Sequence, residues 1–277
     1  MEKGRKIAVI IAAAGLGTRM GQGVPKQYLN IGGRPMLLQT AKAFAESGVV
    51  DELIVVASEE WQAETGAMLR NGGICATVVC GGAQRQDSVY AGLLALSPEV
   101  TYVLIHDGAR PYVTPENIRA IALAVVEKSA VVCAVPVKDT IRRCVGPMEG
   151  LEQTDSVTMP RSELYAVQTP QAFEKNLILR AHEAAREAGF YGTDDAVLVE
   201  RIGARIYLIP GDYGNIKITT KEDIQAQLLA PTSAYCAFHG AYRRWVRRRR
   251  RATTPGAGQS RMAAKGRCGA KSAKKNT

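Results

Sequence analysis

Residues 12–29 read AAAGLGTRMGQGVPKQYL and continue an apolar run, Ile7–Ala13, that is typical of a buried strand. Glycines surround Arg19, and Lys26 follows directly after a proline. A glycine-rich turn lets backbone N–H groups approach an anion closely because no Cβ intervenes. The two basic side chains add positive charge at the same place. The segment therefore predicts a strand that leads into a polyphosphate-binding loop.

The spacing of these glycines excludes two common phosphate loops. The chain has no G-x-x-x-x-G-K-[ST] sequence, and the glycines at 15, 17 and 21 run G-x-G-x-x-x-G, one residue longer than the dinucleotide fingerprint. An ordinary strand–turn–helix is the plain alternative. The basic residues before Ile7 also give some likeness to a secretory signal peptide, but the apolar core is about as short as such regions get.

Positive charge is distributed unevenly along the 277 residues, whose formal net charge is +10. Residues 231–277 contain 13 Lys and Arg and no acidic residue, whereas residues 1–230 contain 23 basic and 26 acidic residues. The tail has too few apolar side chains to offset the entropy lost on ordering. We therefore expect one globular domain over residues 1–230 and a disordered basic tail over 231–277. Such a tail is expected to bind polyanions without sequence preference.

Cysteine and histidine usage excludes several classes of protein. The six cysteines form no C-x-x-C pair, and neither H-E-x-x-H nor G-x-S-x-G is present. These absences argue against a disulfide framework, a zinc site and a serine hydrolase. The longest apolar runs fall short of the roughly 18 residues that a membrane span needs. Together they predict a cytoplasmic protein with reduced thiols.

Short β-branched runs alternate with helical patterns over most of residues 1–230. This alternation predicts an α/β fold with a mostly parallel sheet and helices on both faces. The expected strands are 7–13, 53–57, 77–80, 102–106, 131–136 and 205–209. The expected helices are 37–45, 59–69, 84–96, 115–128, 175–188, 194–202 and 221–229.

Polar and glycine-rich clusters follow four of these strands. They are the loop at 15–26, GGAQRQDS at 81–88, HDGARP at 106–111 and PVKDT at 136–140. Ligands of parallel sheets bind outside the carboxyl ends of the strands. Four clusters on one sheet edge therefore predict a single site.

Residues 138–170 break the alternation and contain Gly146-Pro147 and short extended pieces. An excursion of this length in a compact domain is usually functional. We expect a projecting β-arm that packs on a partner subunit, and a solvated surface loop is the alternative.

The clusters, together with VQTPQAF, GTDDA and GNIKIT further along, resemble the 2-C-methyl-D-erythritol 4-phosphate cytidylyltransferase family over about residues 5–230. The resemblance implies a Rossmann-like nucleotidyltransferase fold and a homodimer completed by the arm. It implies transfer of CMP from CTP to methylerythritol phosphate in non-mevalonate isoprenoid precursor synthesis. It also implies Mg²⁺ that is held mainly by the CTP phosphates, with no metal ligand from the protein.

The resemblance assigns roles to residues that match the family's motifs. The catalytic residues would be Arg19, Lys26 and Lys217. The CTP-binding residues would be Ala13, Ala14, Gly15, Gly82, Ala83, Ser88 and Asp107. The acceptor-binding residues would be Arg110, Thr140, Arg161, Thr169 and Thr193, some of them from the partner's arm. Ala83 departs from the family, whose members often carry a polar residue there, so only a backbone contact would survive at this position.

Two other functions stay open. A ribitol-5-phosphate cytidylyltransferase of the same superfamily would share the triphosphate loop, although the HDGARP and Thr140–Thr169 regions favour methylerythritol phosphate. A nucleic-acid-binding protein is suggested by the arginine run 247–251, but the complete set of site residues argues against it.

Some site residues also have purely structural interpretations. Arg85 could begin a helix in a solvated turn, and Thr193 could be the N-cap of the helix that follows it. Lys217 could be an ordinary exposed strand residue, and we expect His106 to end a strand and pack.

Overall fold

The computed structural model describes residues 5–15, 24–144, 156–220 and Asp223. Arg19, the tail at 231–277 and the expected helix at 221–229, apart from Asp223, lie outside the described residues. Within the described ranges, no helix is both long enough and apolar enough to cross a membrane.

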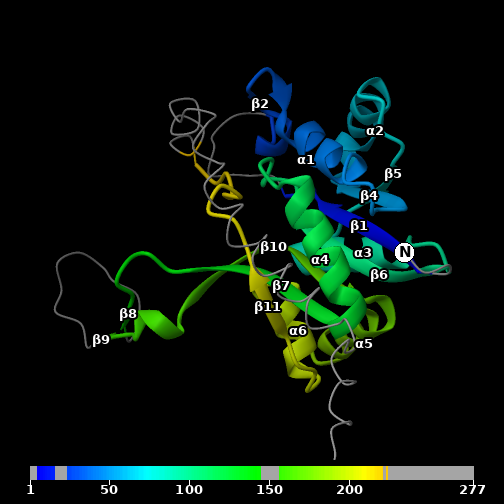
Figure 1. Cartoon of the computed structure of the whole chain (residues 1–277). Helices are drawn as coiled ribbons and strands as arrows, with labels where there is room; N and C mark the ends of the chain where they lie inside the picture. Colours follow the sequence, from blue (N-terminus) through cyan, green and yellow to red (C-terminus); the bar gives the residue numbers. More distant parts are fainter. Residues whose placement is uncertain (1–4, 16–23, 145–155, 221–222, 224–277) are drawn as a thin grey trace, which may run out of the picture. The chain divides into compact units, whose positions relative to one another are not determined.

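A seven-stranded sheet runs through the structure in the order β11-β7-β10-β6-β1-β4-β5 (Figure 1). All strands run parallel except β10, which is antiparallel to both of its neighbours. The predicted mostly parallel sheet is therefore confirmed. The strands are β1 (Lys6–Ala12), β4 (Glu52–Ala57), β5 (Thr77–Cys80), β6 (Val100–Asp107), β7 (Ala130–Pro136), β10 (Tyr165–Glu174) and β11 (Tyr207–Pro210).

Helices cover both faces of the sheet, because the central strands are apolar on both sides (Figure 1). In β1, Val9 packs with Phe44 in one core, whereas Ile10 packs with Phe173 in the other. The first core receives side chains from α1 (Met36–Ala45), α2 (Gln62–Asn71) and α4 (Pro115–Lys128). The second receives side chains from α3 (Arg85–Leu94), α5 (Lys175–Glu187) and α6 (Asp195–Arg201).

The shorter elements lie in the connections. They are η2 (Lys26–Tyr28), β2 (Asn30–Ile31), β3 (Arg34–Pro35), η3 (Glu59–Trp61), β8 (Arg142–Cys144), β9 (Ser156–Thr158) and η4 (Arg161–Glu163).

Strand β10 was not predicted at its full length, since only its first residues read as an extended piece. It contains Gln168, Thr169 and Gln171, polar residues that are nonetheless buried. Each is hydrogen-bonded to a distant segment, which removes the cost of burying it. Pairing with β7 is interrupted between Val167 and Gln171. At this point Gln168 bonds to Asp212 after β11, and Thr169 contacts His106 and Asp107 at the end of β6.

The excursion at 138–170 contains a separate two-stranded antiparallel sheet, formed by β8 and β9. Arg142 donates hydrogen bonds to the side chains of Ser156 and Thr158 across this pair. Extended structure in the excursion is therefore confirmed. Its role in dimerisation stays a prediction.

Candidate active site

A pocket of about 620 Å³ lies at the carboxyl ends of β1, β5 and β6. We call it the main pocket. It brings together described residues of the first three predicted strand-end clusters and Lys217 from the segment after β11. The predicted site residues that line it are Ala13, Ala14, Gly15, Lys26, Gly82, Ala83, Ser88, Asp107 and Lys217.

The second cluster requires glycine because its backbone runs close to neighbouring atoms. A Cβ on Gly82 would lie 2.4 Å from Cβ of Asp87, and one on Gly81 would lie 2.4 Å from Cβ of Ala14. The Gly82 N–H donates to Oγ of Ser88 at 3.2 Å, and the Ser88 hydroxyl donates to the Gln84 carbonyl at 3.1 Å. Ser88 therefore supports the loop backbone as well as lining the pocket.

Gln27 holds the start of the glycine-rich loop, a role that the sequence did not reveal. It is buried, and its Nε2 donates to the carbonyls of Ala13 and Gly15. The neighbouring Tyr28 stacks on Trp61, with the ring centroids 4.3 Å apart. These contacts anchor η2, so Lys26 enters the main pocket from a fixed backbone, where its Nζ donates to the Ile218 carbonyl at 2.9 Å.

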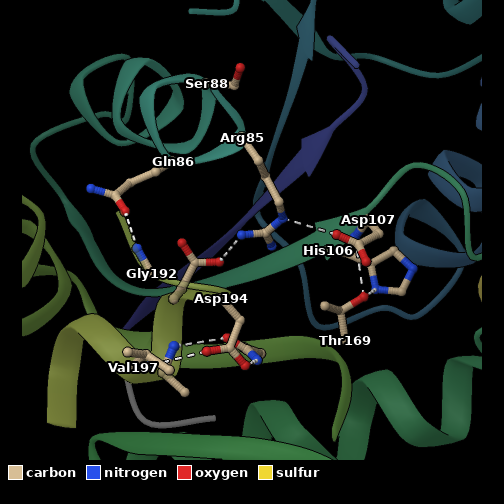
Figure 2. Close-up of polar contacts among 12 residues, drawn as sticks. Arg85, Gln86, Ser88, His106, Asp107, Thr169, Gly192, Asp194 and Val197 are labelled. Carbon is tan, nitrogen blue, oxygen red and sulfur yellow. Dashed lines mark hydrogen bonds and ion pairs between the residues drawn. The ribbon is translucent and has the colours of Figure 1, made fainter. Parts of the chain in front are cut away.

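Asp107 lies at the centre of a cluster of three cations, of which Figure 2 shows Arg85. Its Oδ1 is 3.2 Å from Nε of Arg85, and its Oδ2 is 2.9 Å from Nζ of Lys217 and 3.6 Å from Nε of Arg110. The Asp107 side chain is 9% exposed, so these contacts are poorly screened by solvent. The Asp107 backbone N–H donates to Oγ1 of Thr169 at 3.1 Å, which ties the end of β6 to β10.

Burial would raise the pKa of Asp107, but Arg85, Lys217 and Arg110 together lower that pKa well below its usual range. Asp107 is therefore a carboxylate at neutral pH. Burial lowers the pKa of His106 to about 4, so this residue is neutral. His106 packs against Phe44 and contacts Thr169 through Nδ1 at 3.0 Å, as expected for a structural histidine.

Arg85 is not in a solvated turn. It contacts two carboxylates, since its Nη1 also lies 2.8 Å from Oδ2 of Asp195 on α6. Burial would lower the pKa of Arg85, but Asp195 and Asp107 raise it above its ordinary value.

Lys217 lies in an irregular segment, so the interpretation as a strand residue is wrong. The segment is attached on both sides of Lys217. Nδ2 of Asn215 donates to the Thr169 carbonyl at 2.7 Å, and the Ile218 N–H donates to the Ala109 carbonyl at 2.9 Å. Buried neighbours thus hold the backbone, while the Lys217 side chain is 41% exposed beside the main pocket.

The predicted acceptor residues are dispersed. Arg110 is largely buried and donates to the Asn215 carbonyl at 2.8 Å. Thr169 is buried behind Asp107. Thr140 and Arg161 are exposed and do not line the main pocket, and Nη1 of Arg161 donates to the Lys138 carbonyl at 2.9 Å.

Thr193 lines a smaller cavity of about 90 Å³ together with Arg85 and Asp195. The expectation that Thr193 is the N-cap of α6 is wrong. The N-cap is Asp194, whose Oδ1 accepts from the Val197 N–H at 3.1 Å (Figure 2). A carboxylate at this position also interacts favourably with the helix dipole.

A family model for 2-C-methyl-D-erythritol 4-phosphate cytidylyltransferase matches residues 7–230. The chain belongs to this family. A cytidylyltransferase of this name from Bacillus cytotoxicus is 45% identical over 220 residues, which cover 78% of this chain and 93% of the relative. One from Caldanaerobacter subterraneus is 46% identical over 225 residues, covering 79% of this chain and 95% of the relative.

Two solved structures of proteins in this family are similar to this chain. The 4-diphosphocytidyl-2C-methyl-D-erythritol synthase of Anaerococcus prevotii has a TM-score of 0.70 and 32% identity, covering 82% of this chain and all of its own. The cytidylyltransferase of Thermus thermophilus has a TM-score of 0.66 and 33% identity, covering 80% and 96%. The fold expected from the resemblance is therefore confirmed, and the main pocket is the candidate active site of a cytidylyltransferase.

The main pocket does not fit a metal ion held by protein ligands. Asp107 is the one carboxylate among its described lining residues, and both of its oxygens face cations. In the described part of the chain, no group of three potential metal ligands comes together. Asp107 is thus a partner for basic side chains here.

Proposed function

We propose that this protein transfers CMP from CTP to 2-C-methyl-D-erythritol 4-phosphate, giving CDP-methylerythritol and pyrophosphate. The observation that supports it best is the main pocket, in which a glycine-rich backbone and the basic side chains Lys26, Arg85 and Lys217 surround one space. Family membership supports the identity of both substrates.

The proposed reaction does not depend on proton transfer by a strong base. A phosphate oxygen of the acceptor attacks the α-phosphorus of CTP. The bond between this phosphorus and the oxygen that bridges it to the β-phosphate breaks, and pyrophosphate leaves. Because the nucleophile is already anionic, no strong base is needed. The requirement is to neutralise two polyanions and to hold them in line. Arg19 and Lys26 are proposed to contact the triphosphate, and Lys217 the α-phosphate.

Cytosine is proposed to be recognised by backbone groups of Ala13, Ala14, Gly82 and Ala83, with Ser88 nearby. Gly15 is proposed to hold the triphosphate with Arg19 and Lys26. Asp107 faces the ribose in this proposal, since a carboxylate can accept further hydrogen bonds while paired with cations. Mg²⁺ is proposed to enter bound to the CTP phosphates, where it would offset their negative charge. Arg110, Thr169 and Thr193 are proposed to contribute to the acceptor side.

Pyrophosphate release tests this function directly. With CTP and Mg²⁺, we expect methylerythritol phosphate to support turnover with a higher kcat/KM than ribitol 5-phosphate. A reaction with CTP and Mg²⁺ but without an acceptor gives the background rate. A higher kcat/KM for ribitol 5-phosphate would show that the rival acceptor is the correct one, and no release with either acceptor would contradict the proposed transfer.

We further propose that the β-arm at residues 138–170 completes the active site of a partner subunit in a homodimer. Thr140 and Arg161 match acceptor-binding positions of the family, yet neither lines the main pocket of its own chain. A site shared between subunits accounts for both facts.

Mixing two inactive variants tests this arrangement. Arg161→Ala alters the arm and leaves the pocket intact, whereas Lys217→Ala alters the pocket and leaves the arm intact. If the arm acts on the partner, mixed dimers contain one site with both native elements, so mixing the two variants and allowing subunits to exchange should restore activity. Activity that stays at the sum of the separate variants, after sedimentation has shown that mixed dimers form, would mean that the arm acts on its own chain.

The basic tail is proposed to contribute little to catalysis. A chain that ends at Ala230 is expected to keep its kcat and to lose any affinity for RNA or anionic vesicles. That affinity should fall steeply with salt in the full chain because it depends on counterion release. Loss of turnover on truncation would show that the tail belongs to the enzyme.

The cytoplasmic location also stays a prediction.

A further inference from the structure

Arg85 joins the main pocket to the interior of the domain through a series of charged contacts, the outermost of which, with Asp107, is visible in Figure 2. Its Nε contacts Asp107 at 3.2 Å and its Nη1 contacts Asp195 at 2.8 Å. Asp195 in turn lies 3.2 Å from Nε2 of His182 on α5. Asp195 and His182 are almost completely buried, at 1% and 0% side-chain exposure. The inner end of this series is therefore fixed by packing.

The outer end of the series lies at the pocket. Asp107 uses Oδ1 for Arg85 and Oδ2 for Lys217. We propose that Arg85 is a positioning residue for cytidylyl transfer: it holds one oxygen of Asp107 so that the other orients the Lys217 ammonium toward the substrates. This inference rests on the role proposed above for Lys217.

The geometry calls for an arginine. Two different nitrogens of one planar guanidinium contact two carboxylates that belong to different elements, Asp107 at the end of β6 and Asp195 at the start of α6. A lysine ammonium is a point charge on a flexible stem and does not hold two carboxylates in fixed directions. The backbone of Asp107 is already held by Thr169, so Arg85 decides mainly how its carboxylate is turned.

Arg85 also changes how strongly Asp107 attracts Lys217. With Arg85 in place, the negative charge of Asp107 is shared among Arg85, Arg110 and Lys217. Without Arg85, Arg110 and Lys217 would be the remaining cations beside the carboxylate among the residues that the structure describes. Asp107 could then turn both oxygens toward Lys217, and the ammonium would be drawn away from the anionic substrates. Displacing a catalytic charge by about 1 Å can cost about 10²-fold in rate.

A purely structural role for Arg85 would act through Asp195, by tying α3 to α6. A positioning role and a structural role of Arg85 therefore predict different effects when Asp195 is replaced. The variants are Arg85→Gln, Arg85→Lys, Asp195→Asn and the double variant Arg85→Gln/Asp195→Asn, with Arg119→Gln as a matched control. Arg119 pairs with Glu116 on α4 and does not line the main pocket. The double variant removes both members of the buried pair and so leaves neither charge alone.

We expect Arg85→Gln to lower kcat about tenfold or more, with a much smaller change in KM for CTP. Arg85→Lys should recover part of this loss. Asp195→Asn should lower kcat far less, and the double variant should keep the low kcat of Arg85→Gln even though it is folded. The acid limb of the pH profile should move to higher pH in Arg85→Gln, because Asp107 loses one of the cations that lower its pKa while Arg110 and Lys217 remain. Arg85 also helps to lower the pKa of the neighbouring His106, which lies at about 4, so the loss of Arg85 moves the titration of both groups in the same direction.

Two results would overturn the inference. One is an Arg85→Gln variant with native kcat. The other is equal losses in Arg85→Gln and Asp195→Asn with an unmoved acid limb, which would assign Arg85 to structure. Failure of the underlying site assignment is recognised separately, by a Lys217→Ala variant with native kcat. Circular dichroism and thermal unfolding of every variant separate loss of fold from loss of rate.

Discussion

Replacing Lys26 with alanine is expected to lower kcat by about 10²-fold or more while the fold persists. The size follows from the cost of removing one preorganised group that stabilises charge as the leaving pyrophosphate forms. Lys26 extends from η2, and η2 is anchored independently by Gln27 and by the stacking of Tyr28 on Trp61. Removing the ammonium should therefore leave the backbone of the pocket in place.

The measurement is the rate of pyrophosphate release at saturating CTP and acceptor, with thermal unfolding of the same samples. Lys42→Ala is the matched control, because Lys42 on α1 forms an exposed pair with Glu46, the residue that follows this helix, and does not line the main pocket. Near-native turnover of the Lys26 variant would remove this residue from the catalytic set. Arg19→Ala is expected to behave like Lys26→Ala.

Asp107→Asn is expected to lower the free energy of unfolding by about 3 kcal/mol at neutral pH, the lower end of the cost of breaking a buried ion pair. Asparagine has the same shape but removes the charge that balances Arg110 and leaves Arg85 with Asp195 as its remaining carboxylate partner. Lys217 contributes less to this loss because its side chain is 41% exposed and solvent can compensate it. Turnover should fall as well, since Lys217 loses the group that orients it.

The difference in unfolding free energy between the native protein and Asp107→Asn should become smaller at acidic pH. The three cations lower the pKa of Asp107 in the folded state, so its contribution is fully present above the unfolded value of about 3.9 and is lost as the pH falls below it. Urea unfolding of the native protein and Asp107→Asn should therefore differ by a constant amount from neutral pH down to about 5, and by less at lower pH. Asp139→Asn, at an exposed position, is the control and should show no such difference. A difference that grew on acidification would contradict the ion-pair explanation.

Local sequence determined most of the secondary structure. Helix α4 coincides with its predicted range, and the predicted parallel strands agree with β1, β4, β5, β6, β7 and β11 to within two residues at each end. The reason is that β-branched runs and helical periodicity report burial within a single element. The glycines after β5 were also predictable, because close backbone approach at Gly81 and Gly82 excludes a side chain whatever the rest of the fold does.

Strand β10 shows where local patterns fail. Its polar residues are buried because partners far away in the sequence satisfy them: Gln168 bonds to Asp212, and Thr169 accepts from the Asp107 N–H, 62 residues away. Propensity counts such residues as exposed, whereas tertiary hydrogen bonds remove the cost of burying them. The same reason explains why the sequence did not predict the role of Gln27, whose side chain bonds to the carbonyls of Ala13 and Gly15.

For the active site, the sequence by itself determined which of the described residues gather: Gly15, Lys26, Asp107 and Lys217 follow from strand ends and motif matches. Only the tertiary structure decided how they are held. Arg85 and Asp195 are 110 residues apart, yet their contact links the pocket to α6. No period or spacing encodes such a pair, because it forms only when the sheet brings the start of α3, the end of β6 and the start of α6 to one edge. Electrostatic attraction in that buried place then determines the orientation of the side chains.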